Sequence, residues 1–360
     1  MTKPILIVGG YGVVGMQLAR IIRARNPKLP ILLAGRTLKK AEAAAKQIGY
    51  ARGVLIDTNS LLPLEGVDEP LGAVIGVVND PDSALMREAI LRETPYIDIT
   101  RWTERLKDAA LLASTMDLKA SVALSSSWMA GICALIAKKM AMNFSQIEEI
   151  NTDILFRLND NAGPDSIEYA DRLSIPFRIW RGGKWQMAKP LTDPKQVIFP
   201  SGYEGKALRF DEPSQETLSL YTGAKSVSSR ITYDDASTNK VMAFLVRSGL
   251  WSLISGPAFT KFRRSLIYNP GSGAAHEMVI TVTGKDTENR KAHVQATIVD
   301  PKGQTHMTAV GAYIQLCEAV GLEGRSKREA GIFLPENLDT PDYAISLLHE
   351  HGIEVLFEEL

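Results

Sequence analysis

Short apolar runs alternate with amphipathic stretches over the first third of the chain. The amphipathic stretches repeat their apolar positions at helical spacing, as at Val14, Leu18, Ile21 and Ile22. Strands are predicted at 5–8, 31–34, 53–56, 73–78, 96–99 and 121–124. Helices are predicted near 13–26, 38–47, 82–92, 102–116 and 129–142. This alternation is typical of a parallel sheet covered by helices, and it predicts an α/β fold class.

The pattern of apolar and polar positions changes after about residue 145 and predicts antiparallel strands. Strands at 176–181 and 184–187 flank Gly182-Gly183, which predicts a β-hairpin with a two-residue glycine turn. A second pair is predicted at 276–283 and 290–299, joined by the polar turn 285–289. A turn at 300–303, a helix near 306–321, a loop from Gly331, a helix near 341–351 and a strand at 354–357 follow. These features predict a second, mixed α+β domain with its own sheet.

The stretch 241–266 mixes bulky apolar residues with four basic ones and has no simple period. An interfacial membrane helix is one interpretation, but Gly249, Gly256 and Pro257 would break it. The sequence favours the alternative of packed helices that line the cleft between the domains.

Composition excludes several classes of protein. Lys and Arg together number 41, as do Asp and Glu, so no net charge attracts nucleic acid. The two cysteines, Cys133 and Cys317, lie in separate apolar contexts without clustered histidines, so we expect core thiols and no metal site. No signal peptide or run long enough to span a membrane is apparent, so we expect a cytoplasmic protein.

A glycine motif follows the first predicted strand and opens the first helix. Its G-x-G-x-x-G positions are Gly10, Tyr11, Gly12, Val13, Val14 and Gly15. In that context the glycines allow a tight turn, close approach of a diphosphate and close helix–strand packing, while the helix N-terminus attracts the diphosphate. The sequence therefore predicts a Rossmann-type dinucleotide site.

The end of the second strand indicates which dinucleotide binds. An NAD enzyme usually carries Asp or Glu there, but this chain has no acidic residue before Glu42. Arg36 is predicted to contact a 2′-phosphate and stack on adenine, and Thr37 to donate a hydrogen bond. Lys39, followed by Lys40, either adds to this contact or belongs to a solvated helix face. The predicted cofactor is NADP(H).

Polar and aromatic residues after the later strands are further candidates. Asp57 and Asn79 either contact the cofactor or only cap a turn. Asp98 either serves as an acid near the nicotinamide or caps a helix, and Trp128 either walls the nicotinamide pocket or belongs to the core. His276, after the glycine-rich segment 269–273, either faces the cleft as a second catalytic candidate or is structural. No arrangement typical of a hydrolase or metal enzyme is present.

Several segments resemble the saccharopine dehydrogenase/reductase family. The resemblance rests on residues 9–15, 34–37 with 40–42, 77–79, 96–100 and 127–131, and more loosely on 211–218 and 331–338. Where the family commonly has Pro-Gly, this chain has Ala130-Gly131. The resemblance implies an NAD(P)-binding domain, a mixed substrate domain and a C-terminal segment that returns to the first. It also implies chemistry at a C–N bond, although a convincing match to the family's dicarboxylate-binding residues is absent.

These observations predict three segments and one leading function. The segments are an NADP-binding domain at 1–128, a substrate and dimerisation domain at 129–305, and a C-terminal segment at 306–360. The predicted function is an NADP(H)-dependent oxidoreductase that reduces an imine or oxidises an amine of a small, amino-acid-like substrate. The alternatives are an enoyl reductase of an acyl substrate and a non-catalytic NADP(H)-binding sensor or scaffold. We expect a homodimer.

Overall fold

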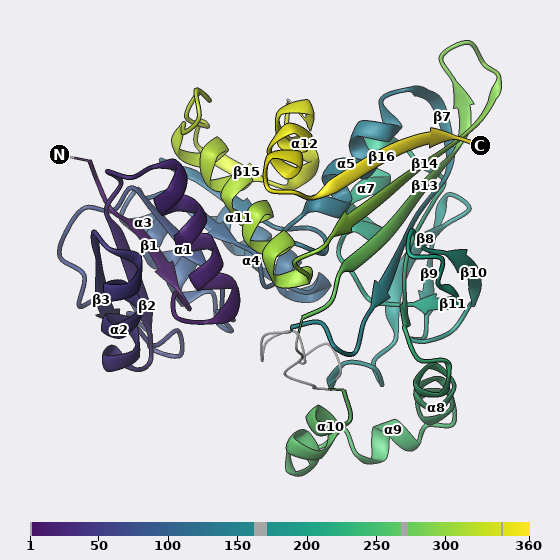
Figure 1. The fold of residues 1–360 in the computed structure, drawn as a ribbon, viewed down its shortest axis with the longest axis horizontal. Helices are drawn as coiled ribbons and strands as arrows, with labels where there is room; N and C mark the ends of the chain where they lie inside the picture. Colours follow the sequence, from purple (N-terminus) through teal and green to yellow (C-terminus); the bar gives the residue numbers. More distant parts are fainter. Residues whose placement is uncertain (1, 162–170, 268–272, 340) are drawn as a thin grey trace. The chain divides into compact units, whose positions relative to one another are not determined.

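The computed structural model describes residues 2–161, 171–267, 273–339 and 341–360. The chain forms two compact units, each assembled from two segments of sequence (Figure 1). The first comprises Met1–Ile132 and Thr308–Leu338, and the second comprises Cys133–Met307 and Asp339–Leu360. The C-terminal region is thus divided between the units. Most of the glycine-rich segment 269–273, predicted to precede His276, lies outside the described residues.

The first unit contains a seven-stranded parallel sheet with the order β15-β6-β5-β4-β1-β2-β3. Its strands are β1 (Ile5–Val8), β2 (Ile31–Gly35), β3 (Ala51–Leu55), β4 (Ala73–Gly76), β5 (Tyr96–Asp98), β6 (Ser121–Leu124) and β15 (Gly331–Phe333). The order reverses beside β1, where Ile7 pairs with both Leu33 of β2 and Ile75 of β4. A ligand crevice forms at such a switch point, beyond the carboxyl ends of the strands.

Helices connect these strands as the amphipathic pattern predicts. They are α1 (Val13–Arg25), α2 (Leu38–Ile48), α3 (Ala84–Leu91) and α4 (Thr103–Ser114), and most of α11 (Gln304–Val320) also belongs to this unit. Leu18 and Ile22 of α1 are fully buried, as the predicted apolar stripe requires. The four residues of β1 are buried on both faces, because helices cover both sides of a parallel sheet.

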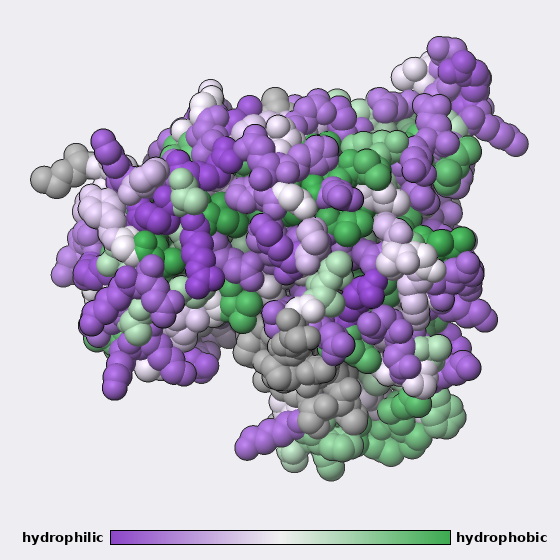
Figure 2. Space-filling view, in the orientation of Figure 1, coloured by the Kyte–Doolittle hydropathy of each residue, from purple (hydrophilic) through white to green (hydrophobic). Residues whose placement is uncertain are grey.

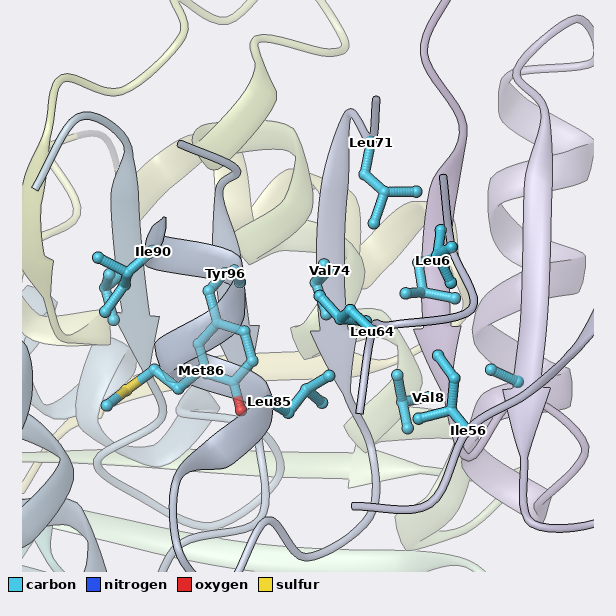
Figure 3. Close-up of a cluster of buried hydrophobic side chains, with 14 of the residues drawn as sticks. Leu6, Val8, Ile56, Leu64, Leu71, Val74, Leu85, Met86, Ile90 and Tyr96 are labelled. Atoms are coloured by element: carbon cyan, nitrogen blue, oxygen red, sulfur yellow. The ribbon is translucent and has the colours of Figure 1, made fainter. Parts of the chain in front are cut away.

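One continuous apolar core supports the crevice. Leu6 and Val8 of β1 point to the same face of the sheet as Val74 of β4, and Leu85 and Met86 of α3 pack over that face (Figure 3). All five side chains are essentially inaccessible to solvent. Burial of a side chain of this kind stabilises a fold by about 1.5–3 kcal/mol, so the strand ends that carry the candidate site are firmly positioned.

The second unit contains a mixed seven-stranded sheet with the order β10-β11-β12-β7-β13-β14-β16 and a separate hairpin, β8-β9. Its strands are β7 (Phe144–Phe156), β8 (Phe177–Arg181), β9 (Lys184–Ala188), β10 (Lys195–Ile198), β11 (Glu204–Arg209), β12 (Ser226–Tyr233), β13 (His276–Asp286), β14 (Lys291–Asp300) and β16 (Glu354–Glu359). Its helices are α5 (Ile132–Ala141), α7 (Ser214–Thr222), α8 (Ala236–Arg247), α9 (Leu250–Leu253), η2 (Pro257–Phe259), α10 (Thr260–Ile267) and α12 (Pro341–Glu350). The predicted fold class, a parallel Rossmann-type sheet with a second mixed α+β domain, is confirmed.

Local signals predict some elements of the second unit and miss others. The Gly182-Gly183 hairpin forms as predicted, with φ of +60° and +74° at its two glycines. The long central strand β7 was not predicted, because the pairing with β13 skips Glu148 and Ser145 of β7, so the apolar positions of β7 do not keep a period of two. The loop predicted at Gly331 was wrong, because residues 331–333 form β15 and pair with β6. In the described ranges, no helix has the length and apolarity to cross a bilayer.

Candidate functional site

The glycine motif forms a tight turn between β1 and α1. The Gly12 amide donates a 2.9 Å hydrogen bond to the Gly9 carbonyl, and Gly9 has φ of +91°. A Cβ atom on Gly15 would overlap that carbonyl, and one on Gly10 would lie 2.9 Å from the Ile7 carbonyl. Only glycine fits these positions, as close packing of the loop against strand and helix requires. The first amides of α1, at Val13, Val14 and Gly15, have no partner within their own helix and can bind an anion.

Tyr11, the second residue of the motif, covers the end of the neighbouring strand. A Cβ atom on Gly35 would lie 2.5 Å from the Tyr11 ring, so the ring rests directly on the backbone of β2. Tyr11 therefore lies at the carboxyl end of β2, next to the glycine turn. Sequence reasoning identified the motif but not this reason for a glycine at position 35.

Arg36, Thr37 and Lys39 lie beyond the carboxyl end of β2, and all three are exposed. Across the part of the chain that the structure describes, no hydrogen bond or ion pair engages the guanidinium of Arg36. Thr37 is the N-cap residue of α2 and has extended backbone. Its side chain does not cap the helix, so its hydroxyl is available to an outside partner. An exposed arginine at this strand end can bind a phosphate with its planar fork.

Asp57 and Asn79 follow β3 and β4 at the same edge of the sheet. Asp57 accepts 3.0 Å hydrogen bonds from the amide and the side chain of Asn59, which is a local turn. The Asn79 side chain accepts a 3.1 Å hydrogen bond from Arg105, whose guanidinium stacks 3.8 Å over the Trp102 ring. Because Arg105 belongs to α4, this hydrogen bond fixes the orientation of the Asn79 carboxamide.

Asp98 occupies a buried ion network at the end of β5. One carboxylate oxygen accepts 2.9 Å hydrogen bonds from the amide and hydroxyl of Thr100. The other accepts 2.8 Å hydrogen bonds from the Tyr96 hydroxyl and Arg101 Nε. Arg101 also reaches Asp80 at 3.3 Å, and Asp80 in turn accepts from the first amides of α3. Because both oxygens of the Asp98 carboxylate already accept hydrogen bonds, Asp98 serves to position the surrounding loops.

Burial and charge act in opposite directions in this network. Burial raises the pKa of Asp80, and the helix amides and Arg101 oppose that increase. Burial lowers the pKa of Arg101, but the carboxylates of Asp98 and Asp80 outweigh it and raise that pKa overall. Burial, with a contribution from Asp98, also raises the pKa of the Tyr96 hydroxyl well above its usual range. Arg101 therefore stays charged and holds two carboxylates in the protein interior.

Trp128 lies in the turn that follows β6. Met129, Ala130 and Gly131 all have positive φ, and a Cβ atom on Gly131 would overlap Pro335. The buried Ser126 hydroxyl donates a 2.5 Å hydrogen bond to buried Glu336.

The C-terminal part of the first unit completes the edge of its sheet through two further hydrogen bonds. Gln315 of α11 donates hydrogen bonds of 2.8 Å to the Ser125 hydroxyl and 2.6 Å to the Ala130 carbonyl. The segment 331–338 was the available signal for the contact of Glu336 with Ser126, but the partner of Glu336 could not be predicted from the sequence.

His276 belongs to the second unit, at the start of β13. It is fully buried, and its Nδ1 atom lies 3.5 Å from the Asp160 carboxylate. Neither ring nitrogen has a hydrogen-bond partner among the described residues. The structure therefore places the other candidates at one edge of the first unit's sheet and His276 in a buried imidazole–carboxylate pair of its own.

The chain is similar to several solved dehydrogenase structures, to different degrees. Saccharopine dehydrogenase (L-Glu forming) from Saccharomyces cerevisiae matches 99% of this chain and 100% of its own, with a TM-score of 0.70 and 13% identity. A mutant meso-dapdh from Clostridium tetani solved with DAP covers 97% and 99%, with a TM-score of 0.49 and 10% identity. Scyllo-inositol dehydrogenase from Lactobacillus casei with NAD(H) covers 99% of both chains, with a TM-score of 0.45 and 10% identity. No model of a known family and no curated protein sequence matches. The chain has the saccharopine dehydrogenase fold.

Proposed function

We propose that the chain is an NADP(H)-dependent oxidoreductase whose first unit holds the cofactor. The observation that carries the proposal is the pairing of the glycine turn at Gly10–Gly15 with the exposed Arg36 at the next strand end. The turn leaves room for a diphosphate and presents helix amides to it. Arg36 offers a guanidinium with no protein partner in the described residues, where an NAD enzyme would use a carboxylate.

The proposed cofactor contacts extend along the same edge of the sheet. Thr37 and Lys39 would supplement Arg36 at the 2′-phosphate, and Asp57 would lie near the adenine. Asn79 and Trp128 would lie along the nicotinamide end, where Arg105 already orients the Asn79 carboxamide. The bound cofactor would supply or accept the hydride, and these residues would position it.

A titration of the protein with NADPH and with NADH tests the cofactor assignment. We expect NADPH to bind at least tenfold tighter, about 1.4 kcal/mol, and Arg36→Ala to remove that preference. Arg20→Ala, which removes an exposed arginine from α1, is the matched control and should leave both affinities unchanged. Tight NADH binding that ignores Arg36 would overturn the cofactor choice, and absence of binding by both would overturn the proposal.

We further propose that the hydride is exchanged at a C–N bond of a small, amino-acid-like substrate. The support is the saccharopine dehydrogenase fold over the whole chain, together with the absence of a hydrolase arrangement in the sequence. In the reducing direction the imine carbon gains a hydride and its nitrogen gains a proton, while NADPH becomes NADP⁺. Asp98, held by Arg101 at the end of β5 in the cofactor-binding unit, is our candidate positioning residue for this step.

A screen of NADPH oxidation distinguishes the possible reactions. Turnover with pairs of an amine and a carbonyl compound supports the C–N assignment, whereas turnover with enoyl thioesters alone would favour C=C reduction. NADPH binding without turnover of either substrate class would indicate a sensor or scaffold.

A further inference from the structure

The helical segment that follows β12 exposes an unusual number of large apolar side chains. Phe244 of α8 is 64% exposed and Leu253 of α9 is 73% exposed. Four more side chains in this segment are also exposed: Val241, Leu250, Phe259 and Phe262. Figure 2 shows hydrophobic residues gathered over α8, α9 and α10. We call these six residues the apolar patch. Gatherings of this kind mark interaction surfaces, since isolated exposed apolar residues are normally scattered.

The patch is held in place by buried anchors beneath it. Trp251 of α9 is completely buried, and Met242 is the buried residue of α8. Arg263 of α10 is also buried, with Nε 2.8 Å from the Asp171 carboxylate and Nη1 2.8 Å from the Gly256 carbonyl. Because these groups fix the helices from below, the patch is a formed part of the surface of the second unit.

The helical segment that carries the patch contains basic residues and no acidic ones. No Asp or Glu occurs from residue 236 to residue 267, although acidic and basic residues balance over the whole chain. Lys240, Arg247 and Lys261 are exposed within this segment. Asp235 precedes it and is used as the N-cap of α8, where it accepts from the Thr238 amide. On α8, Lys240, Val241, Phe244 and Arg247 follow helical spacing, so cations flank the apolar positions on one helix face.

We propose that this surface binds peripherally to an anionic lipid bilayer. Apolar side chains enter the boundary between headgroups and acyl chains, while flanking Lys and Arg side chains contact anionic headgroups. The basic character of this segment favours this partner over a second copy of the chain. In a symmetric dimer contact the same cations would face one another and repel. The proposal does not depend on the proposed enzymatic function.

Sedimentation with lipid vesicles tests the proposal. We expect the full chain to bind vesicles of equimolar phosphatidylcholine and phosphatidylglycerol, and to bind phosphatidylcholine alone at least tenfold more weakly. The double variant Phe244→Ser/Leu253→Ser should lower binding to the anionic vesicles at least tenfold. Lys240→Glu/Lys261→Glu should lower it similarly and remove its dependence on salt.

Matched controls distinguish binding by the apolar patch from nonspecific binding by exposed apolar residues elsewhere. Leu220 and Leu111 are as exposed as the patch residues but lie on α7 and α4, so Leu220→Ser/Leu111→Ser should bind like the unaltered protein. Thermal denaturation of each variant verifies the fold. Equal loss in the control variant, or equal binding to neutral vesicles, would overturn the proposal. So would a self-association detected by light scattering that the patch variants abolish, if the unaltered protein binds no vesicles.

Discussion

The Ser126 hydroxyl donates a 2.5 Å hydrogen bond to the Glu336 carboxylate, and both side chains are buried. The two residues are 210 positions apart in the sequence. The bond joins the turn after β6 to the 3₁₀ turn that follows β15. It thereby closes the edge of the parallel sheet with a segment that arrives from the far end of the chain.

We expect Glu336→Ala to lower the free energy of unfolding by about 1–3 kcal/mol, because a buried donor loses its acceptor. Glu336→Gln retains an acceptor and should lose less. Urea denaturation of these variants, of Ser126→Ala and of the double variant gives the interaction energy between the two residues. Additive single-variant effects would show that the bond contributes no coupling.

The close packing of the glycine turn predicts that Gly15→Ala abolishes dinucleotide binding. The added methyl group would overlap the Gly9 carbonyl, so the turn must open and the amides of α1 must shift. Gly66→Ala is the matched control, since a Cβ atom there meets no atom within 4 Å. Fluorescence titration with NADPH should show at least a tenfold loss for the first variant, about 1.4 kcal/mol, and no loss for the control. Unchanged affinity of Gly15→Ala would contradict this account of the turn.

Removal of Arg101 should lower the free energy of unfolding through its effect on the buried ion network. Arg101→Gln leaves Asp80 and Asp98 without their shared cation, and we expect a loss of about 3–5 kcal/mol near neutral pH. Urea denaturation measures this loss, and Arg20→Gln on the exposed face of α1 is the control.

The same variant predicts a dependence of stability on pH. The pKa of Asp80 is already raised by burial, and loss of Arg101 raises it further. A carboxyl group with a raised pKa in the folded state contributes stability at low pH that is lost as the pH rises through that pKa. The deficit of Arg101→Gln should therefore narrow as the pH is lowered from neutral through the raised pKa of Asp80. A deficit that widens on acidification would contradict this assignment of charges.

Thiol reactivity provides a test of the core. Cys133 and Cys317 are both fully buried, and burial, followed by the nearby Glu212 charge, raises the pKa of the Cys133 thiol well above its usual range. We expect neither thiol to react with a disulfide reagent in the native protein, and both to react in denaturant. Cys133→Ala and Cys317→Ala assign the two signals. Rapid reaction of either thiol without denaturant would show that its surroundings open in solution.

The sequence alone was sufficient to predict six of the seven strands of the parallel sheet, the helices between them and the position of the glycine turn. The strand at Ile5–Val8, the apolar stripe of α1 and the Gly182-Gly183 hairpin are local signals, because each depends on residues within one or two turns of chain. The second sheet was harder to predict. The alternation of β7 is interrupted by two extra residues of its own, and such a register shift is decided only when β7 pairs with β13.

Contacts between distant residues were decided only by the tertiary structure. The sequence placed Asp98 at a strand end, but Arg101, Asp80 and Tyr96 meet there only because β4 and β5 pair in the folded sheet. The sequence also predicted packed helices for 241–266. Which of their side chains are exposed depends on what the rest of the second unit covers. Periodicity reports what a segment can bury, and tertiary packing determines what it does bury.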